Sequence, residues 1–112
     1  MAILFFMLFA MITEEWSQFR GPESNGHVQY KDMPEKWSDQ SPVAWKVSIP
    51  GLGWSSPVVV NGRVYLTTAV AQGEGLSLRT LCLDSQTGKT IWEREVRQVS
   101  NAPKIQDRKS VV

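Results

Sequence analysis

The stretch "CLDSQTGKTIW", Cys82 to Trp92, contains the residues whose types and spacing come nearest to a known chemistry. Gly88-Lys89-Thr90 matches the end of a phosphate-binding loop, which reads Gly, four residues, then Gly-Lys-Ser/Thr. The first glycine of such a loop would stand at position 83, which is Leu83. A helix should also follow the loop, whereas the β-branched and aromatic residues after Lys89 favour a strand. The sequence therefore argues against a nucleotide site here.

The same stretch is explained fully as a turn between two strands. Asp84 ends an apolar run, and its carboxylate can accept hydrogen bonds from backbone N–H groups two or three residues further on. Thr87 can form a local hydrogen bond through its hydroxyl group. Gly88 supplies the left-handed backbone conformation that ends such loops. Trp92 then falls in the middle of the returning strand, where its indole can cover a neighbouring sheet.

Few other residues suggest catalysis. His27, the single histidine, follows Ser24-Asn25-Gly26 in a polar stretch without a nearby acidic or nucleophilic partner, so we interpret it as a solvated loop residue. Cys82 is the single cysteine, which excludes an intrachain disulfide and a cysteine-based zinc site. Because it lies between Leu81 and Leu83, we expect a buried, inert thiol. The pair Glu14-Glu15 is interpreted as a solvated flank.

The composition sets the class of the molecule. The chain has 112 residues, enough for one small domain, and 42% of them are hydrophobic, so a packed core is possible. Lys and Arg number 12 against 11 Asp and Glu, a formal net charge of +1. Proteins that bind nucleic acids usually show a clear basic surface, so we predict no nucleic-acid partner.

The first 15 residues differ from the rest. The apolar block "AILFFMLFAMI", Ala2 to Ile12, is shorter than the roughly 20 residues that span a bilayer, so no stable membrane span is expected. Its length suits the core of a signal peptide, although no Lys or Arg precedes it and no clear cleavage pattern follows. We predict an exported protein, periplasmic or in the cell envelope. A buried first strand or helix is the alternative.

Short strand patterns follow a polar, loop-rich segment at residues 16–42. Asn61-Gly62 separates two of the strands and is the strongest two-residue signal for a β-hairpin, because both positions need a positive φ. No stretch has a convincing helical period. The predicted fold is all-β and antiparallel. The expected strands are Val43–Val47, Pro57–Val60, Arg63–Val70, Leu76–Asp84 and Lys89–Val96, with a flexible connection at Gln72–Gly75 and an irregular or truncated tail at 97–112.

The strand predicted at Leu76–Asp84 is apolar on both faces. Leu76, Leu78 and Cys82 share one face, and Leu81 and Leu83 lie on the other. Such a strand is expected to be buried on both sides. Sheets stacked face to face, as in the blades of a β-propeller, satisfy this requirement.

Two patterns resemble a known family. Cys82, Asp84, Thr87, Gly88 and Trp92 match a small residue, Asp, Thr-Gly and Trp at the spacing of the repeat in quinoprotein-type, PQQ-binding-like β-propellers, with Cys82 where Ala is usual. "WSQFRGP", "MPEKW" and "VAWKVSIPGLGWSSPVVVNGRVYLTT" resemble the opening of exported propeller proteins of this type from planctomycete-type bacteria. Together the two resemblances cover roughly residues 16 to 96.

The resemblance implies about one four-stranded blade plus a preceding strand, and hence an N-terminal fragment of a propeller. It implies a structural or protein-interaction scaffold whose partners are the remaining blades or another protein. On this interpretation the chain contains no catalytic residue, cofactor or metal. The alternative is the N-terminal part of a PQQ-dependent dehydrogenase, whose quinone, calcium and catalytic residues would belong to blades absent from this chain. In that case Trp54 could stack on the quinone, although packing is its simpler role.

Overall fold

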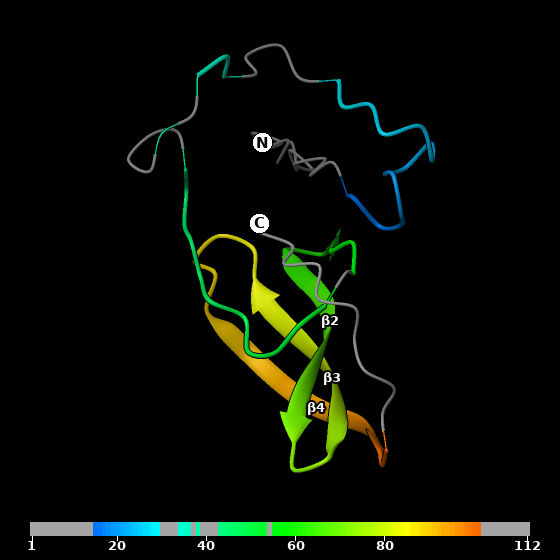
Figure 1. Ribbon diagram of the computed structural model, residues 1–112. Helices are drawn as coiled ribbons and strands as arrows, with labels where there is room; N and C mark the ends of the chain where they lie inside the picture. The colour runs from blue at the N-terminus through cyan, green and yellow to red at the C-terminus, as the bar shows by residue number, and fades with distance from the viewer. Residues whose placement is uncertain (1–14, 30–33, 37, 39–42, 54, 102–112) are drawn as a thin grey trace, which may run out of the picture.

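The computed structural model describes residues 15–29, 34–36, 38, 43–53 and 55–101. Within these ranges the chain forms one four-stranded antiparallel sheet and no helix. Figure 1 shows the three long strands as one twisted sheet. The predicted all-β, antiparallel fold is confirmed. In spatial order, which is also the sequence order, the strands are β1 (Val58–Val60), β2 (Arg63–Gln72), β3 (Gly75–Asp84) and β4 (Thr90–Val99).

The β1–β2 hairpin closes at Asn61-Gly62, as predicted. Val60 pairs with Arg63 across the turn, so the loop has two residues. Asn61 has a φ of 50° and Gly62 a φ of 71°. Two consecutive positive φ angles are the requirement of a type I′ turn, whose twist matches that of the flanking strands. The backbone N–H of Asn61 donates to Oε1 of Glu15 at 3.1 Å.

The connection between β2 and β3 is tighter than expected. Gln72 pairs with Gly75, so only Gly73 and Glu74 form the loop, and Gly73 has a φ of 60°. A positive φ at the first loop position is typical of a two-residue hairpin. The segment that the sequence suggested as a flexible connection is therefore a defined turn. The strands that it joins are each ten residues long.

The last strand continues beyond its predicted end at Val96. Arg97 and Val99 pair with Leu78 and Leu76, so residues 97–99 belong to β4 and not to an irregular tail. The sequence obscured this because the register shifts between Leu78 and Arg79 and leaves Val96 unpaired. Such a β-bulge interrupts the alternation of side chains on which the prediction depended.

The strand predicted at Val43–Val47 is not formed. These residues are described, and none of them belongs to the sheet. The segment instead passes the β3–β4 turn (Figure 1). There the indole Nε1 of Trp45 donates to the carbonyl oxygen of Ser85 at 2.8 Å. Alternating apolar residues give a strand only when a neighbouring strand offers backbone partners, and in the described structure this segment is held by a side chain.

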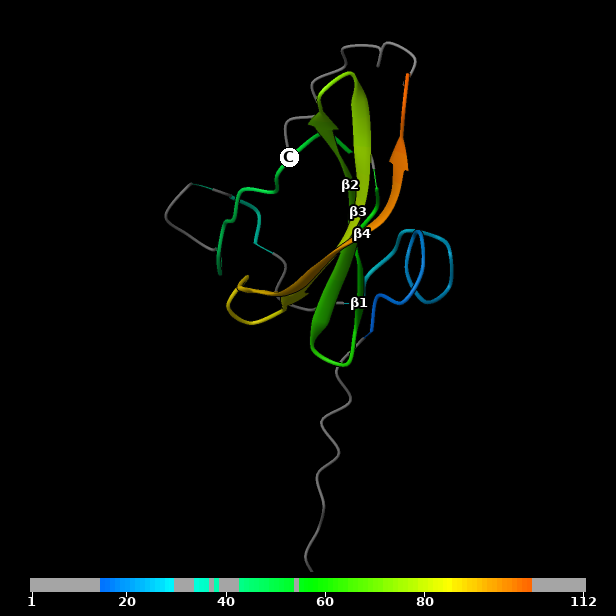
Figure 2. The ribbon, with the colours of Figure 1, turned by 90° about the horizontal axis from the view of Figure 1, so that it is seen from below.

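Short segments extend the pairing of the sheet at β1 and β2. The carbonyl oxygen of Trp16 accepts from the backbone N–H of Val59 at 2.8 Å, which places the N-terminal segment along the outer edge of β1 (Figure 2). Leu52 exchanges two backbone hydrogen bonds with Ala69, at 2.9 and 2.8 Å. Two residues before Ala69 on β2, the backbone nitrogen and the carbonyl oxygen of Thr67 each lie 3.1 Å from Oγ of Ser55. Thr67 and Ala69, on the edge of β2 that the three-residue β1 leaves open, thus have hydrogen-bond partners.

The core lies along β3, the strand with a long neighbour on each side. One side of the sheet, the Tyr65 face, carries Tyr65, Cys82 and Trp92, which the register places in one row across β2, β3 and β4. The other side, the Leu81 face, carries Val64, Leu81 and Leu83. Leu81 and Leu83 are 1% and 2% exposed, and Cys82 is fully buried. The prediction that this strand is apolar on both faces is confirmed.

Candidate functional site

The five residues of the predicted repeat motif lie at one end of the sheet. Cys82 and Asp84 end β3, Thr87 and Gly88 lie in the turn, and Trp92 is the third residue of β4. The turn is fastened to the β1–β2 hairpin, because the backbone N–H of Ser85 donates to the carbonyl oxygen of Gly62 at 3.0 Å. A strand follows the turn, so the strand-to-helix setting of a phosphate-binding loop is absent here.

Asp84 organises the turn through one carboxylate oxygen. Its Oδ1 accepts from the backbone N–H of Gln86 at 2.9 Å and from that of Thr87 at 2.8 Å, and it lies 3.0 Å from the Thr87 hydroxyl group. The hydrogen bonds from Thr87 are the largest cause that lowers the pKa of Asp84 below its ordinary value of 3.8, followed by that from Gln86. The charge of Lys89 lowers this pKa further. The carboxylate is thus held ionised as an acceptor for backbone groups.

Two features require glycine at position 88: its backbone conformation, and the close contact with a residue far away in the sequence. Its φ is 70°, in the region that favours glycine. A Cβ atom at this position would lie only 2.5 Å from Cε3 of Trp45. The Trp45 indole therefore lies directly on the glycine while its Nε1 hydrogen-bonds to Ser85. Sequence reasoning missed this contact, since the turn residues contain no signal for a partner 40 positions away.

Cys82 lies beneath two aromatic rings. Tyr65 and Trp92 are its register neighbours on β2 and β4, and their ring centroids lie 6.1 Å apart at an interplanar angle of 54°. This tilted arrangement is one of the favourable geometries for aromatic pairs. A small side chain at position 82 lets the two rings approach each other over it. The thiol is buried, as predicted, which keeps it away from solvent and reagents.

The Leu81 face has a polar end that sequence reasoning did not identify. Ser77 is fully buried, and its hydroxyl group hydrogen-bonds to the Glu95 carboxylate. Nε of Arg79 donates to the Ser77 oxygen at 3.0 Å, and Nη1 of Arg79 forms a 2.7 Å ion pair with Glu93. The Arg79 and Glu93 side chains are 29% and 32% exposed, so water screens the pair. The network satisfies the buried hydroxyl group and offers no free nucleophile.

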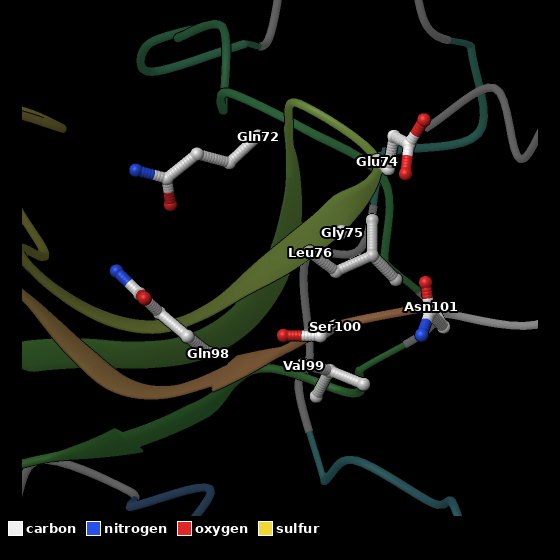
Figure 3. Close-up of a pocket in the computed structure, with 8 residues that line it drawn as sticks. All are labelled: Gln72, Glu74, Gly75, Leu76, Gln98, Val99, Ser100 and Asn101. Atoms are coloured by element: carbon white, nitrogen blue, oxygen red, sulfur yellow. The ribbon is translucent and has the colours of Figure 1, made fainter.

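The opposite end of the sheet has an open, mostly polar pocket. Figure 3 shows it between the β2–β3 turn and the end of β4. Its volume is about 400 Å³. The lining contains one carboxylate and no histidine, cysteine, lysine or arginine, so it has no convergent acid–base pair. It is lined by Gln72, Glu74, Gly75, Leu76, Gln98, Val99, Ser100 and Asn101.

Among the described residues, the other candidates from the sequence have no site around them. His27 is exposed, and its backbone N–H donates to Oδ1 of Asn25 at 2.9 Å within a loop. Trp54, Glu14 and the apolar block at 2–12 lie outside the described residues. Among residues that the structure describes, no three His, Cys, Asp or Glu side chains form a group that could hold a metal ion. In that same part of the chain, no helix is long and apolar enough to cross a bilayer.

Comparisons with known protein families, curated proteins and solved structures found no match for this chain.

Proposed function

We propose that this chain is a repeat module of an exported β-propeller-type protein that acts as a structural or protein-interaction scaffold. Its partner is another sheet, which packs on the Tyr65 face. Two observations support the proposal: the motif at Cys82–Trp92, and a difference in burial between the two faces of the sheet.

The difference in burial between the faces carries the proposal. On the Leu81 face, Val64, Leu81 and Leu83 are all buried within the chain itself. On the Tyr65 face, a shallow, mostly apolar hollow remains open beside the aromatic pair. Leu52 and Val96 at this hollow are 58% and 70% exposed. Its lining includes Leu52, Thr67, Ala69, Leu78, Thr80 and Val96.

The physical reason is that a sheet with apolar residues on both faces needs a layer on each side. At about 25 cal/mol per Å² of apolar surface removed from water, covering the hollow would favour association. A second sheet can provide this covering layer, because two sheets pack face to face at about 10 Å with interdigitated side chains. The half-buried Trp92 would contribute its remaining surface to the same contact.

Association that stabilises the fold should make thermal unfolding depend on protein concentration. We expect the midpoint of unfolding, followed by far-ultraviolet circular dichroism, to rise as the concentration of this chain is raised over two or three decades, because copies of the chain substitute for the absent partner sheet. A midpoint that does not change with concentration, with a cooperative transition of a monomer, would contradict the proposal and favour an independent small β-domain.

A binding measurement tests whether this chain itself holds the quinone and calcium of a dehydrogenase. Calcium needs 6–8 oxygen ligands, and the described residues do not supply a cluster of carboxylates for it. We therefore expect equilibrium dialysis of this chain against pyrroloquinoline quinone and Ca²⁺ to give no saturable binding. Saturable binding of both at equal stoichiometry would overturn the scaffold proposal and favour the enzyme.

A further inference from the structure

Two Asn-Gly dipeptides in the described residues have very different surroundings. In such a dipeptide, the backbone nitrogen that follows asparagine can attack the side-chain amide carbon, because glycine has no side chain to obstruct the approach. Asn25-Gly26 lies in the N-terminal loop, and Asn61-Gly62 forms the β1–β2 turn. Both asparagines are exposed to solvent. Exposure alone therefore does not distinguish them.

Hydrogen bonds protect Asn25. The nucleophile of the reaction, the backbone nitrogen of Gly26, donates its hydrogen to the carbonyl oxygen of Arg20 at 2.8 Å. The amide Nδ2 of Asn25 donates to Glu23 at 2.9 Å, and its Oδ1 accepts from the backbone N–H of His27 at 2.9 Å. Nucleophile and electrophile are thus both held, and both must be released before they can react.

Asn61 has none of these restraints. Its side-chain amide makes no hydrogen bond to described residues, and neither does the backbone N–H of Gly62. The contacts that hold this turn use other atoms, namely the backbone N–H of Asn61, bonded to Glu15, and the carbonyl oxygen of Gly62, bonded to Ser85. The turn also closes a hairpin whose first strand, β1, has only three residues. Such a short ladder opens locally at low free-energy cost, which lets the backbone of Asn61 rotate towards the reactive geometry.

We propose that Asn61 is a site of spontaneous modification, at which the asparagine converts to aspartate and isoaspartate through a cyclic imide. The nitrogen of Gly62 forms a bond to Cγ of Asn61 and loses its proton. The bond from Cγ to Nδ2 breaks, and ammonia leaves. Water then opens the ring at either carbonyl group. Opening at the backbone carbonyl gives isoaspartate, in which the main chain runs through the former side chain.

The modification has a structural consequence at this turn. Isoaspartate adds a methylene group to the main chain of a two-residue loop whose length sets the strand register. It also places a carboxylate near the Glu15 carboxylate, which already accepts from residue 61. Both effects weaken the hold of β1 on β2. As the reaction proceeds with time, the pairing of β1 with β2 at this edge of the sheet is therefore weakened in a growing fraction of the molecules.

The test compares the two sites within one molecule, and it needs no variant that could fail to fold. The intact chain is incubated in buffer at mildly alkaline pH and physiological temperature, and peptide mapping by mass spectrometry follows both sites over time. An isoaspartyl-specific methyltransferase then distinguishes isoaspartate from aspartate. We expect modification at Asn61 to be at least several-fold faster than at Asn25.

Denaturation provides the matched control, because it removes the hydrogen bonds around Asn25. In denaturant the two rates should converge, mainly through acceleration at Asn25. Equal rates in buffer, or a faster reaction at Asn25, would overturn the proposal. An unchanged difference in denaturant would overturn it too, since the neighbouring sequence would then account for the difference. Asn61→Asp, which suits the same turn, should abolish ammonia release from this site and leave that at Asn25 unchanged.

Discussion

At the scale of single residues, the β3–β4 turn depends on Gly88 and Asp84 in different ways. Gly88 combines a left-handed backbone with a direct contact to the Trp45 ring. Asp84 combines a charge with three hydrogen bonds inside the turn. Steric and electrostatic contributions can therefore be tested separately at two positions of one motif.

Gly88→Ala should lower the free energy of unfolding by more than the cost of the left-handed backbone conformation alone. The left-handed conformation alone costs a residue with a Cβ atom about 1–2 kcal/mol, and the new methyl group would also displace the Trp45 indole. Gly73→Ala is the matched control, because Gly73 has a φ of 60° and a methyl group added there would meet nothing within 4 Å. Urea unfolding should show the larger loss for Gly88→Ala. Equal losses would mean that the Trp45 contact contributes nothing.

The Asp84 carboxylate should give the turn an acid-sensitive component. Because the pKa of Asp84 is lowered in the folded chain, the unfolded state binds the proton more readily. The free energy of unfolding therefore falls as the pH falls from the unfolded pKa to the folded one. The contribution is fully present above the unfolded pKa and is lost as the pH drops through the lower, folded value. Urea unfolding between about pH 6 and pH 2 should give a shallower pH dependence for Asp84→Asn than for the wild type. Parallel curves would contradict this role.

The residues of this turn could be predicted because their interactions are local. Asp84, Thr87 and Gly88 satisfy one another within five positions, so composition and spacing were sufficient. Trp45 could not be predicted, since its partners lie 40 or more positions away and an indole in an apolar run does not specify its neighbour. The Ser77–Arg79–Glu95 network was missed for the same reason, because a strand pattern gives the face of each side chain and not the register across strands.

At the scale of elements, the prediction was best where a turn defines the strands on both sides. Asn61-Gly62 fixed the start of β2, and the Asp84–Lys89 turn fixed the end of β3. It was poorest at the end of β4, where a bulge at Val96 broke the alternation. It also failed at Val43–Val47, where the strand pattern is present and no strand forms, since pairing depends on a neighbour that the pattern cannot reveal.

Ser55 should protect the open edge of β2. Its hydroxyl group is bonded to both polar backbone groups of Thr67, at 3.1 Å each. Ser55→Ala removes hydrogen bonds that are typically worth about 0.5–1.5 kcal/mol each, so the Thr67 amide should exchange with deuterium several-fold faster. Ser56→Ala is the control at a neighbour that is also exposed, and it should leave the exchange of that amide unchanged. Equal exchange in both variants would show that solvent replaces the hydroxyl group without cost.

At the scale of the whole molecule, the two faces of the sheet differ in how far their apolar residues are buried. The Leu81 face buries Val64, Leu81 and Leu83 within the chain, and its far end is polar. The Tyr65 face keeps Leu52 and Val96 accessible beside the Tyr65–Trp92 pair. The outer edge of the sheet, at β4, is interrupted by bulges at Ile91 and Val96, and the charged residues 93–95 lie between them. Bulges and charges discourage further strands from pairing at an edge, so association is expected through the Tyr65 face.

Sedimentation velocity of the wild type and two charge variants tests this expectation most directly. Val96→Glu places a carboxylate at the open hollow of the Tyr65 face, and Gln98→Glu adds the same charge on the same strand beside the polar end of the Leu81 face. We predict concentration-dependent association for the wild type and for Gln98→Glu, and a monomer with an unchanged β-sheet spectrum for Val96→Glu. A monomeric wild type, or association that persists in Val96→Glu, would contradict the claim that another sheet covers the Tyr65 face.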